Sequence, residues 1–273
     1  MEETYRGWVA ALNGGVPVDF SKFLNPTFQH DHQTLTIEAW VESLLQIKEV
    51  LGPSHIDIDY IMADEDAQCL ASRLLIKCKP QQPMMGITPS GQEVSYAEIQ
   101  FAWFTNNGKM SRIDRVSDTA AIVKQLKDPN ETYNFDSASK PETSTTTTLS
   151  KEELEKSYES LVESINTRTM REKFPQFAHE HMMRNIDSME AMMAAMPDVR
   201  GTTRTTLVDA KAQRLFAQFE LSGKPVAPIA GFEATGRTVA FNEHVLFEWV
   251  DGKVRRNWVL LDWDTMGKQL KGE

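Results

Sequence analysis

The sequence predicts an α+β fold that occurs twice in tandem. Three observations predict it. In each half, segments with a helical spacing of apolar residues precede strand-like segments; a Ser-, Thr- and Pro-rich stretch separates the halves; and the same markers recur in the same order on both sides. Helices followed by a run of strands are typical of α+β domains, and a repeat decides the domain organisation.

Each half begins with two helices. Tyr5, Trp8 and Leu12 lie on one helical face, and residues 36–51 repeat that period until Gly52-Pro53 ends the helix. The second half has an opening helix around Tyr158 and Leu161 and another over residues 186–196.

Four strand-like segments follow the helices in each half. They span 55–62, 68–78, 93–104 and 109–118 in the first half, and 202–209, 212–221, 237–250 and 253–262 in the second. Asn106-Asn107-Gly108 and Asp251-Gly252 are hairpin-turn signals between the last two strands of each half. We therefore expect an antiparallel sheet in each.

The internal repeat is clearest near the end of each half. Residues 108–127 align without gaps on 252–271, with eight of twenty positions identical. Further markers place Glu98 opposite Glu243, Arg73 opposite Arg214, and the segment 28–32 opposite 177–181. We predict two domains, 1–127 and 151–273, joined by a flexible linker over residues 128–150.

The composition disfavours some classes of binding partner. The net charge is −10 and both halves are acidic, which disfavours nucleic acid and anionic membrane surfaces. No apolar run approaches the ~20 residues of a membrane span, and the N-terminus lacks the pattern of a signal peptide. Cys69 and Cys78 are expected to be reduced, so a cytoplasmic location is expected.

The closing strand carries a family resemblance. The pattern G-K-[apolar]-x-x-x-W-x-x-x-D, followed by Q-L, is met by Trp258, Asp262 and Gln269-Leu270, whereas the first unit has Asp114 at the Trp position. With the order of elements, this resembles the SnoaL-like polyketide cyclase/isomerase family of the nuclear-transport-factor-two-like superfamily.

The resemblance implies two cone-shaped α+β barrels, each a curved antiparallel sheet wrapped around helices and holding a deep apolar pocket. Relatives cyclise, isomerise or dehydrate polyketide and terpenoid intermediates, or open epoxides, usually without cofactors or metals. Many pair through their sheets as homodimers. A duplicated chain is therefore expected to form an intramolecular pseudo-dimer, with a further homodimer as an open alternative.

Strand alternation selects candidate catalytic groups. It places Trp258 and Asp262 on one face of the last strand together with Val254, Arg256 and Leu260, and it places Glu243 with Phe241 on the neighbouring strand. A carboxyl group in an apolar row should have a raised pKa that suits acid/base catalysis. Glu243 and Asp262 are thus a predicted proton-transfer pair, with Trp258 and Phe241 contacting substrate.

The first unit offers the corresponding groups. Glu98 and Asp118 are the counterparts of the proton-transfer pair, and Tyr96 and Asp114 are predicted to contact substrate. We expect the pocket of the second unit, or second cup, to be the active one, because this unit keeps both Trp258 and Asp262.

Arg73 and Arg214 lie in apolar strands, where two roles are open. Each could polarise a substrate carbonyl or hold an enolate, or each could be the structural salt partner of Glu98 or Glu243.

Two pairs of histidines also fit acid/base chemistry. His30 and His32, and likewise His179 and His181, would share one side of an extended segment. His30 and His179 are candidate acid/base groups, and His32 and His181 are candidate substrate contacts. No metal site is predicted, since no third ligand stands at a recognised spacing. Packing at the cup rim is the commoner fate of such residues.

The function predicted from these residues is a cofactor-free cyclase/isomerase or dehydratase that moves protons on a hydrophobic polyketide or terpenoid intermediate of secondary metabolism. A non-catalytic small-molecule-binding or scaffold protein is one alternative, and an epoxide hydrolase is another. Methionines concentrated between residues 170 and 196 suggest an adaptable apolar lining, although core filling is the commoner use.

Overall fold

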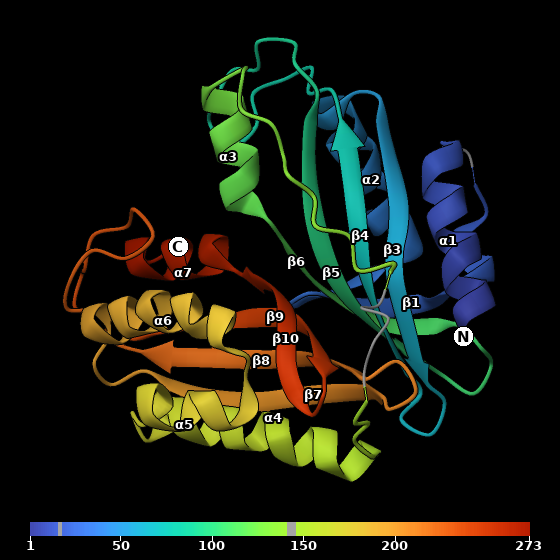
Figure 1. Ribbon diagram of the computed structural model, residues 1–273. Helices are drawn as coiled ribbons and strands as arrows, with labels where there is room; N and C mark the ends of the chain where they lie inside the picture. The colour runs from blue at the N-terminus through green and yellow to red at the C-terminus, as the bar shows by residue number, and fades with distance from the viewer. Residues whose placement is uncertain (16–17, 141–145) are drawn as a thin grey trace. The chain divides into compact units, whose positions relative to one another are not determined.

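The computed structural model describes residues 1–15, 18–140 and 146–273, without the side chains of residues 184 and 185. The chain divides into two compact units, Met1–Ser139 and Lys140–Glu273 (Figure 1). Each unit is an α+β domain in which helices cover a curved, mainly antiparallel sheet. The predicted tandem α+β fold is confirmed.

The first unit contains a six-stranded sheet in the order β2-β1-β6-β5-β4-β3, in which only the β1–β6 pairing is parallel. The predicted strands and the two predicted helices are all present. A hairpin, β1–β2, and a closing helix, α3, were not foreseen. The elements are α1 (Glu2–Gly14), β1 (Leu24–His30), β2 (Gln33–Thr36), α2 (Ile37–Leu51), β3 (Ser54–Asp64), β4 (Cys69–Cys78), β5 (Val94–Phe104), β6 (Met110–Ser117) and α3 (Thr119–Lys127).

The second unit repeats this plan with a sheet in the order β10-β9-β8-β7, which matches β6-β5-β4-β3. A capping box, in which Ser150 and Glu153 exchange hydrogen bonds, starts its first helix. The elements are α4 (Lys151–Asn166), α5 (Met170–Phe177), the 3₁₀ helix η2 (Glu180–Met183), α6 (Arg184–Ala195), β7 (Arg200–Asp209), β8 (Arg214–Gly223), β9 (Val239–Val250), β10 (Lys253–Leu261) and α7 (Trp263–Lys271).

The extended segment predicted around His179 and His181 is wrong. Helix α5 ends just before it, and His181 lies in η2. Helical turns here bury Phe174, Phe177 and Met182 in the core of the unit, which an extended chain with a period of two would not do.

The prediction that Val254, Arg256, Trp258 and Leu260 share one face of the last strand is also wrong. Val254 pairs with Trp249 and Arg256 pairs with Glu248, so Arg255 is an extra residue in a β-bulge. The first unit has the same bulge at Ser111. One inserted residue reverses the alternation of every side chain that follows. Asn257, Val259 and Leu261, rather than Arg256, Trp258 and Leu260, therefore face the same side as Val254.

The predicted alignment of Arg73 with Arg214 between the two units is wrong, and the shift is four residues. Glu98 and Glu243 occupy one register position, opposite Leu74 and Phe219 respectively. Arg73 lies opposite Ile99, whereas Arg214 lies opposite Glu248. Apolar strands of similar composition match in more than one register, and only the hydrogen-bond ladder decides between them.

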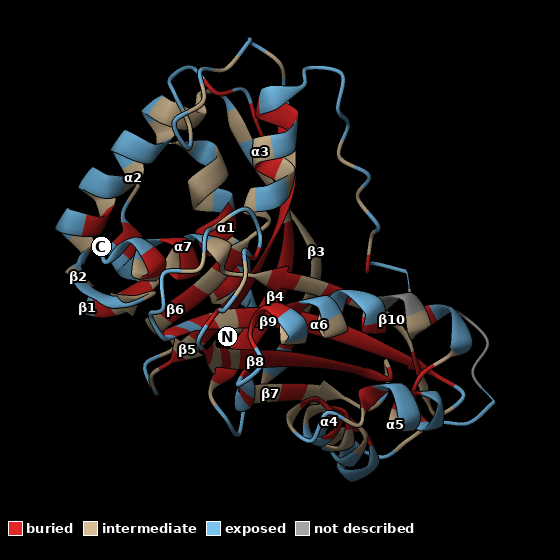
Figure 2. Cartoon of the chain, turned by 90° about the vertical axis from the view of Figure 1, so that its left-hand side faces the viewer, coloured by how far each residue is buried: buried red, intermediate tan, exposed pale blue. Residues whose placement is uncertain are grey.

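Within each unit, hydrophobic clusters join helix residues to sheet residues. Burial in the second unit is concentrated on β8 and β9 (Figure 2). Cys69 and Cys78 lie at the two ends of β4 and are not joined. The predicted domain boundaries stay a prediction. Residues 141–145 of the predicted linker lie outside the described residues, whereas Ser137 and Ala138 hydrogen-bond to Asp59 of the first unit.

Candidate functional site

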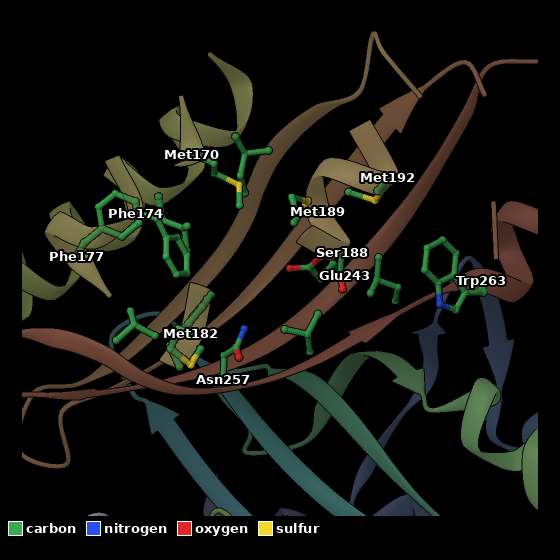
Figure 3. A pocket seen from close by; sticks show the side chains of 16 residues that line it. Met170, Phe174, Phe177, Met182, Ser188, Met189, Met192, Glu243, Asn257 and Trp263 are labelled. Atoms are coloured by element: carbon green, nitrogen blue, oxygen red, sulfur yellow. The ribbon is translucent and has the colours of Figure 1, made fainter. Parts of the chain in front are cut away.

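The second unit contains a cavity of about 430 Å³ between the sheet and its helices (Figure 3). Its wall is mostly apolar and includes four methionines. The lining residues are Leu161 and Ile165 of α4; Met170, Phe174 and Phe177 of α5; Met182; Ser188, Met189 and Met192 of α6; Glu243 and Phe247 of β9; Val254, Asn257, Val259 and Leu261 of β10; and Trp263.

Glu243 provides the cavity with an ionisable group. Strand β9 presents it beside Val245 and Phe247, which belong to the hydrophobic core. The residue is 7% exposed, and burial raises the pKa of its carboxyl group to about 7. Its Oε2 atom has no hydrogen-bond partner among the described residues.

This arrangement suits proton transfer. A carboxyl group with a pKa near 7 is present in both protonation states at neutral pH, so it can accept a proton and return it. Oε2 is available to a bound molecule, and most of the surrounding wall is hydrocarbon. Asn257 adds an amide group to the wall, and Ser188 adds an exposed hydroxyl group.

In the first unit, the corresponding glutamate has hydrogen-bond partners. Glu98 accepts hydrogen bonds from Ser117 Oγ and from Gln100 Nε2, the latter at 2.6 Å. Gln100 accepts in turn from the hydroxyl group of Tyr5 at 2.6 Å, and that hydroxyl group also contacts Ser72 at 2.5 Å. Glu98 is therefore held in a polar network.

A second group of ionisable side chains adjoins this network. Arg115 donates to Asp31 through its main-chain nitrogen at 3.0 Å and through Nε at 3.3 Å. His30 Nδ1 lies 3.5 Å from Asp31 Oδ2. Burial, and then the positive charge of Arg115, lower the pKa of His30, whereas Glu98 acts in the opposite direction. The charge of Glu98 thus acts on His30, and a catalytic role for either residue stays a prediction.

The two hydrogen-bond partners of Glu98, and Arg115, whose charge also acts on it, are replaced by hydrocarbon side chains in the second unit. With the register taken from the ladders, Ser117 is replaced by Leu261, Gln100 by Val245, and Arg115 by Val259. Loss of these groups leaves Glu243 without the compensation that Glu98 receives, which explains the raised pKa of Glu243.

The two predicted catalytic aspartates are helix caps. Asp262 accepts a hydrogen bond from the main-chain nitrogen of Thr265 at 3.0 Å and caps α7. Asp118 does the same for α3, accepting from Ala121 at 3.0 Å, and also accepts from the hydroxyl group of Tyr133. Asp262 is not among the cavity-lining residues.

The predicted arginines and Trp258 lie on the sheet face opposite the cups. Arg214 binds Glu248, with Nη2 at 2.5 Å from Oε2, and its guanidinium lies 5.9 Å from the ring centre of Trp258. Arg73 binds Asp59 at 2.5 Å. Neither arginine pairs with Glu98 or Glu243 in these ion pairs, so the predicted salt partners are wrong.

The remaining predicted residues are dispersed. Asp114 forms a two-point ion pair with Arg112 at 2.9 and 2.5 Å. Phe241 and Tyr96 belong to apolar clusters rather than to the cavity wall. His32 is exposed. His179 and His181 hydrogen-bond through Nε2 to the carbonyl oxygens of Val250 and Arg255 at 2.9 and 2.8 Å.

Sequence reasoning missed most of the cavity wall. Asn257, Val259 and Leu261 were assigned to the wrong face because the bulge leaves no recognisable sequence signal. Helix α5 was not foreseen, so Phe174 was not considered. The one available signal was the run of methionines, of which Met170, Met182, Met189 and Met192 do line the cavity.

Among the residues that the structure describes, no helix is both long and apolar enough to cross a membrane. Within the same residues, no group of three or more His, Cys, Asp or Glu side chains is placed to hold a metal ion.

Several solved structures are similar to one unit of this chain. A SnoaL-like polyketide cyclase from Agrobacterium tumefaciens is 22% identical, with a TM-score of 0.42, and the match covers 46% of this chain and 96% of that one. TsrD from Streptomyces laurentii is 18% identical, with a TM-score of 0.42 and coverages of 46% and 92%. AclR from Streptomyces galilaeus is 21% identical, with a TM-score of 0.39 and coverages of 46% and 94%.

A comparison with curated proteins gave no match. The model of the SnoaL-like polyketide cyclase family matches twice, at residues 2–126 and 147–270. These two matches cover nearly the whole chain and fall on the two structural units. The chain belongs to the SnoaL-like polyketide cyclase family and carries two copies of the family domain in tandem.

Proposed function

We propose that the second unit is a cofactor-free cyclase/isomerase or dehydratase in which Glu243 transfers a proton on a neutral, hydrophobic substrate of the polyketide or terpenoid kind. One observation carries the proposal: a buried carboxyl group with a pKa of about 7 and an unpartnered oxygen faces a mostly apolar cavity of about 430 Å³.

The proposed reaction begins when the Glu243 carboxylate takes a proton from an acidic carbon of the substrate. The electron pair left on that carbon delocalises into an adjacent carbonyl group. The protonated Glu243 then returns the proton to another carbon or to a leaving hydroxyl group, which gives an isomer or a dehydrated product. The apolar wall favours a neutral substrate, because no Lys, Arg or His is among the lining residues to compensate an anion.

Deuterium exchange into 2-tetralone, an enolisable and apolar bicyclic ketone, tests the proton transfer directly. In deuterium oxide the wild-type chain should catalyse exchange at the acidic carbon, and nuclear magnetic resonance should record it. Glu243→Gln should lower that rate by about 10²- to 10⁴-fold, the range of a general acid or base. The wild-type rate should rise with pH through about 7 as the carboxylate forms.

Glu98→Gln is the matched control, because Glu98 occupies the same register position in the first unit. It should keep most of the exchange activity. Circular dichroism would verify that both variants are folded. If Glu98→Gln loses the activity and Glu243→Gln retains it, the first cup is the active one. If both retain it, the proton-transfer mechanism is wrong.

A further inference from the structure

Two helices form facing walls of the cavity in the second unit. Met170 and Phe174 of α5 lie across the cavity from Met189 and Met192 of α6 (Figure 3). Methionine side chains are unbranched and adapt their shape easily. A molecule that enters between these helices would therefore displace flexible side chains on one wall rather than rigid sheet residues.

An ion-pair cluster ties the same two helices together. Arg171, which follows Met170 on α5, donates to both carboxylate oxygens of Glu190 on α6, at 2.8 Å from Nε and 2.6 Å from Nη2. Its Nη2 atom also donates to Asp187 on α6 at 2.7 Å. Glu190 and Asp187 immediately adjoin the lining residues Met189 and Ser188.

We propose that Arg171 is an access-determining residue, whose ion pairs with Glu190 and Asp187 latch α6 to α5 and set how often the cavity opens to an apolar ligand. The inference rests on the proposed function in so far as that function requires a ligand in this cavity. It adds a residue that touches neither the substrate nor Glu243 and acts through the two helices.

The exposure of the cluster suits a latch. All three side chains are largely exposed, at 56% for Arg171, 74% for Asp187 and 44% for Glu190. Exposed ion pairs are weak and are screened by salt, but a two-point arginine–carboxylate contact within a network is the kind that contributes measurably. Such a contact holds the helices together most of the time and still releases readily.

Binding kinetics of N-phenyl-1-naphthylamine, a neutral apolar fluorescent probe, separate a latch from a wall residue. A latch changes the frequency of opening, so Arg171→Gln should raise the association and dissociation rates by the same factor, about two- to fivefold. The dissociation constant should stay unchanged. High salt should accelerate both rates in the wild type and have little effect on Arg171→Gln.

Arg204→Gln is the matched control. Arg204 forms a similar exposed ion pair with Glu220 at 2.6 Å, and neither residue lines the cavity. This variant should keep the wild-type rates and their salt dependence. Equal rates in wild type and Arg171→Gln would overturn the proposal, and so would a change in the dissociation constant with unchanged association, because that is the behaviour of a wall residue.

Hydrogen exchange gives a second measurement that needs no ligand. Arg171→Gln should speed amide exchange in residues 186–195 of α6 and leave α4 unchanged, whereas Arg204→Gln should affect neither helix. If the wild-type chain takes up no probe, the ligand cavity and with it the proposed function fail, and the exchange of α6 alone decides for or against the latch.

Discussion

At the scale of single residues, two glutamates at one register position have different surroundings. Glu98 receives hydrogen bonds from Ser117 and Gln100, whereas Glu243 faces hydrocarbon and has a pKa of about 7. An isolated buried carboxyl group favours its neutral form, while a hydrogen-bonded one is compensated. The same residue type thus belongs to a hydrogen-bonded network in one unit and is a candidate acid/base in the other.

The raised pKa of Glu243 predicts a pH-dependent stability. The folded chain holds the proton more tightly than the unfolded chain, so stability falls as pH rises from about 4.5 to about 7. The full change is about 3 kcal/mol. Urea unfolding of the second unit between pH 4.5 and 8 should show this loss in the wild type and lack it in Glu243→Gln.

One neighbouring group, Tyr158, does not contribute to that measurement. Tyr158, whose pKa is raised by burial and by the charge of Glu243, stays protonated over this range. A pH slope that persists unchanged in Glu243→Gln would show that another group titrates and that Glu243 is not the perturbed one.

At the scale of elements, one extra residue decides which side chains a strand presents to the cavity. The bulge at Arg255 turns Val259 toward the cavity and Trp258 away from it. The ladder on either side of the bulge is regular, so the reversal holds to the end of β10.

This assignment predicts opposite outcomes for two adjacent substitutions. Val259→Trp should fill part of the cavity and weaken N-phenyl-1-naphthylamine binding at least about tenfold, a loss of ~1.4 kcal/mol. Trp258→Phe, on the opposite face, should leave probe affinity unchanged. Fluorescence titration measures both. Unchanged binding in Val259→Trp together with lost binding in Trp258→Phe would contradict this assignment. It would mean that Trp258, and not Val259, faces the cavity.

At the scale of the whole molecule, each of the two compact units contains hydrophobic clusters of its own. Leu74 belongs to a cluster of the first unit, and Leu215 belongs to a cluster of the second. Both side chains are fully buried. The pairing of the units as an intramolecular pseudo-dimer stays a prediction.

Because Leu74 and Leu215 belong to clusters of different units, we predict that their truncation affects different parts of the chain. Leu74→Ala and Leu215→Ala should each destabilise by about 2–5 kcal/mol, through lost burial and the cavity left behind. Hydrogen exchange should speed up in β3–β6 for the first variant and in β7–β10 for the second. Acceleration throughout the chain in either variant would mean that the units unfold together, against the independence of well-separated sites.

The sequence by itself determined the repeat, the order of helices and strands, and the family, because these depend on local periodicity and on residues near one another in the chain. It also identified Glu98 and Glu243 as equivalent, since a carboxyl group in an apolar row is visible in the sequence. It also named His30 as a candidate, which stays a prediction, but it did not name Asp31 and Arg115, which lie beside it.

Only the tertiary structure decided which residues form the site. Because of the bulge at Arg255, Asn257 and Val259 face the cavity and Trp258 does not. The strand registers show that Arg73 and Arg214 are not at equivalent positions. Helix α5 brought Phe174 to a cavity whose other walls come from helices α4 and α6 and from strands β9 and β10. The physical reason is that side-chain direction in a sheet depends on register, and register is decided by hydrogen bonds and packing between strands rather than by the residues of one strand.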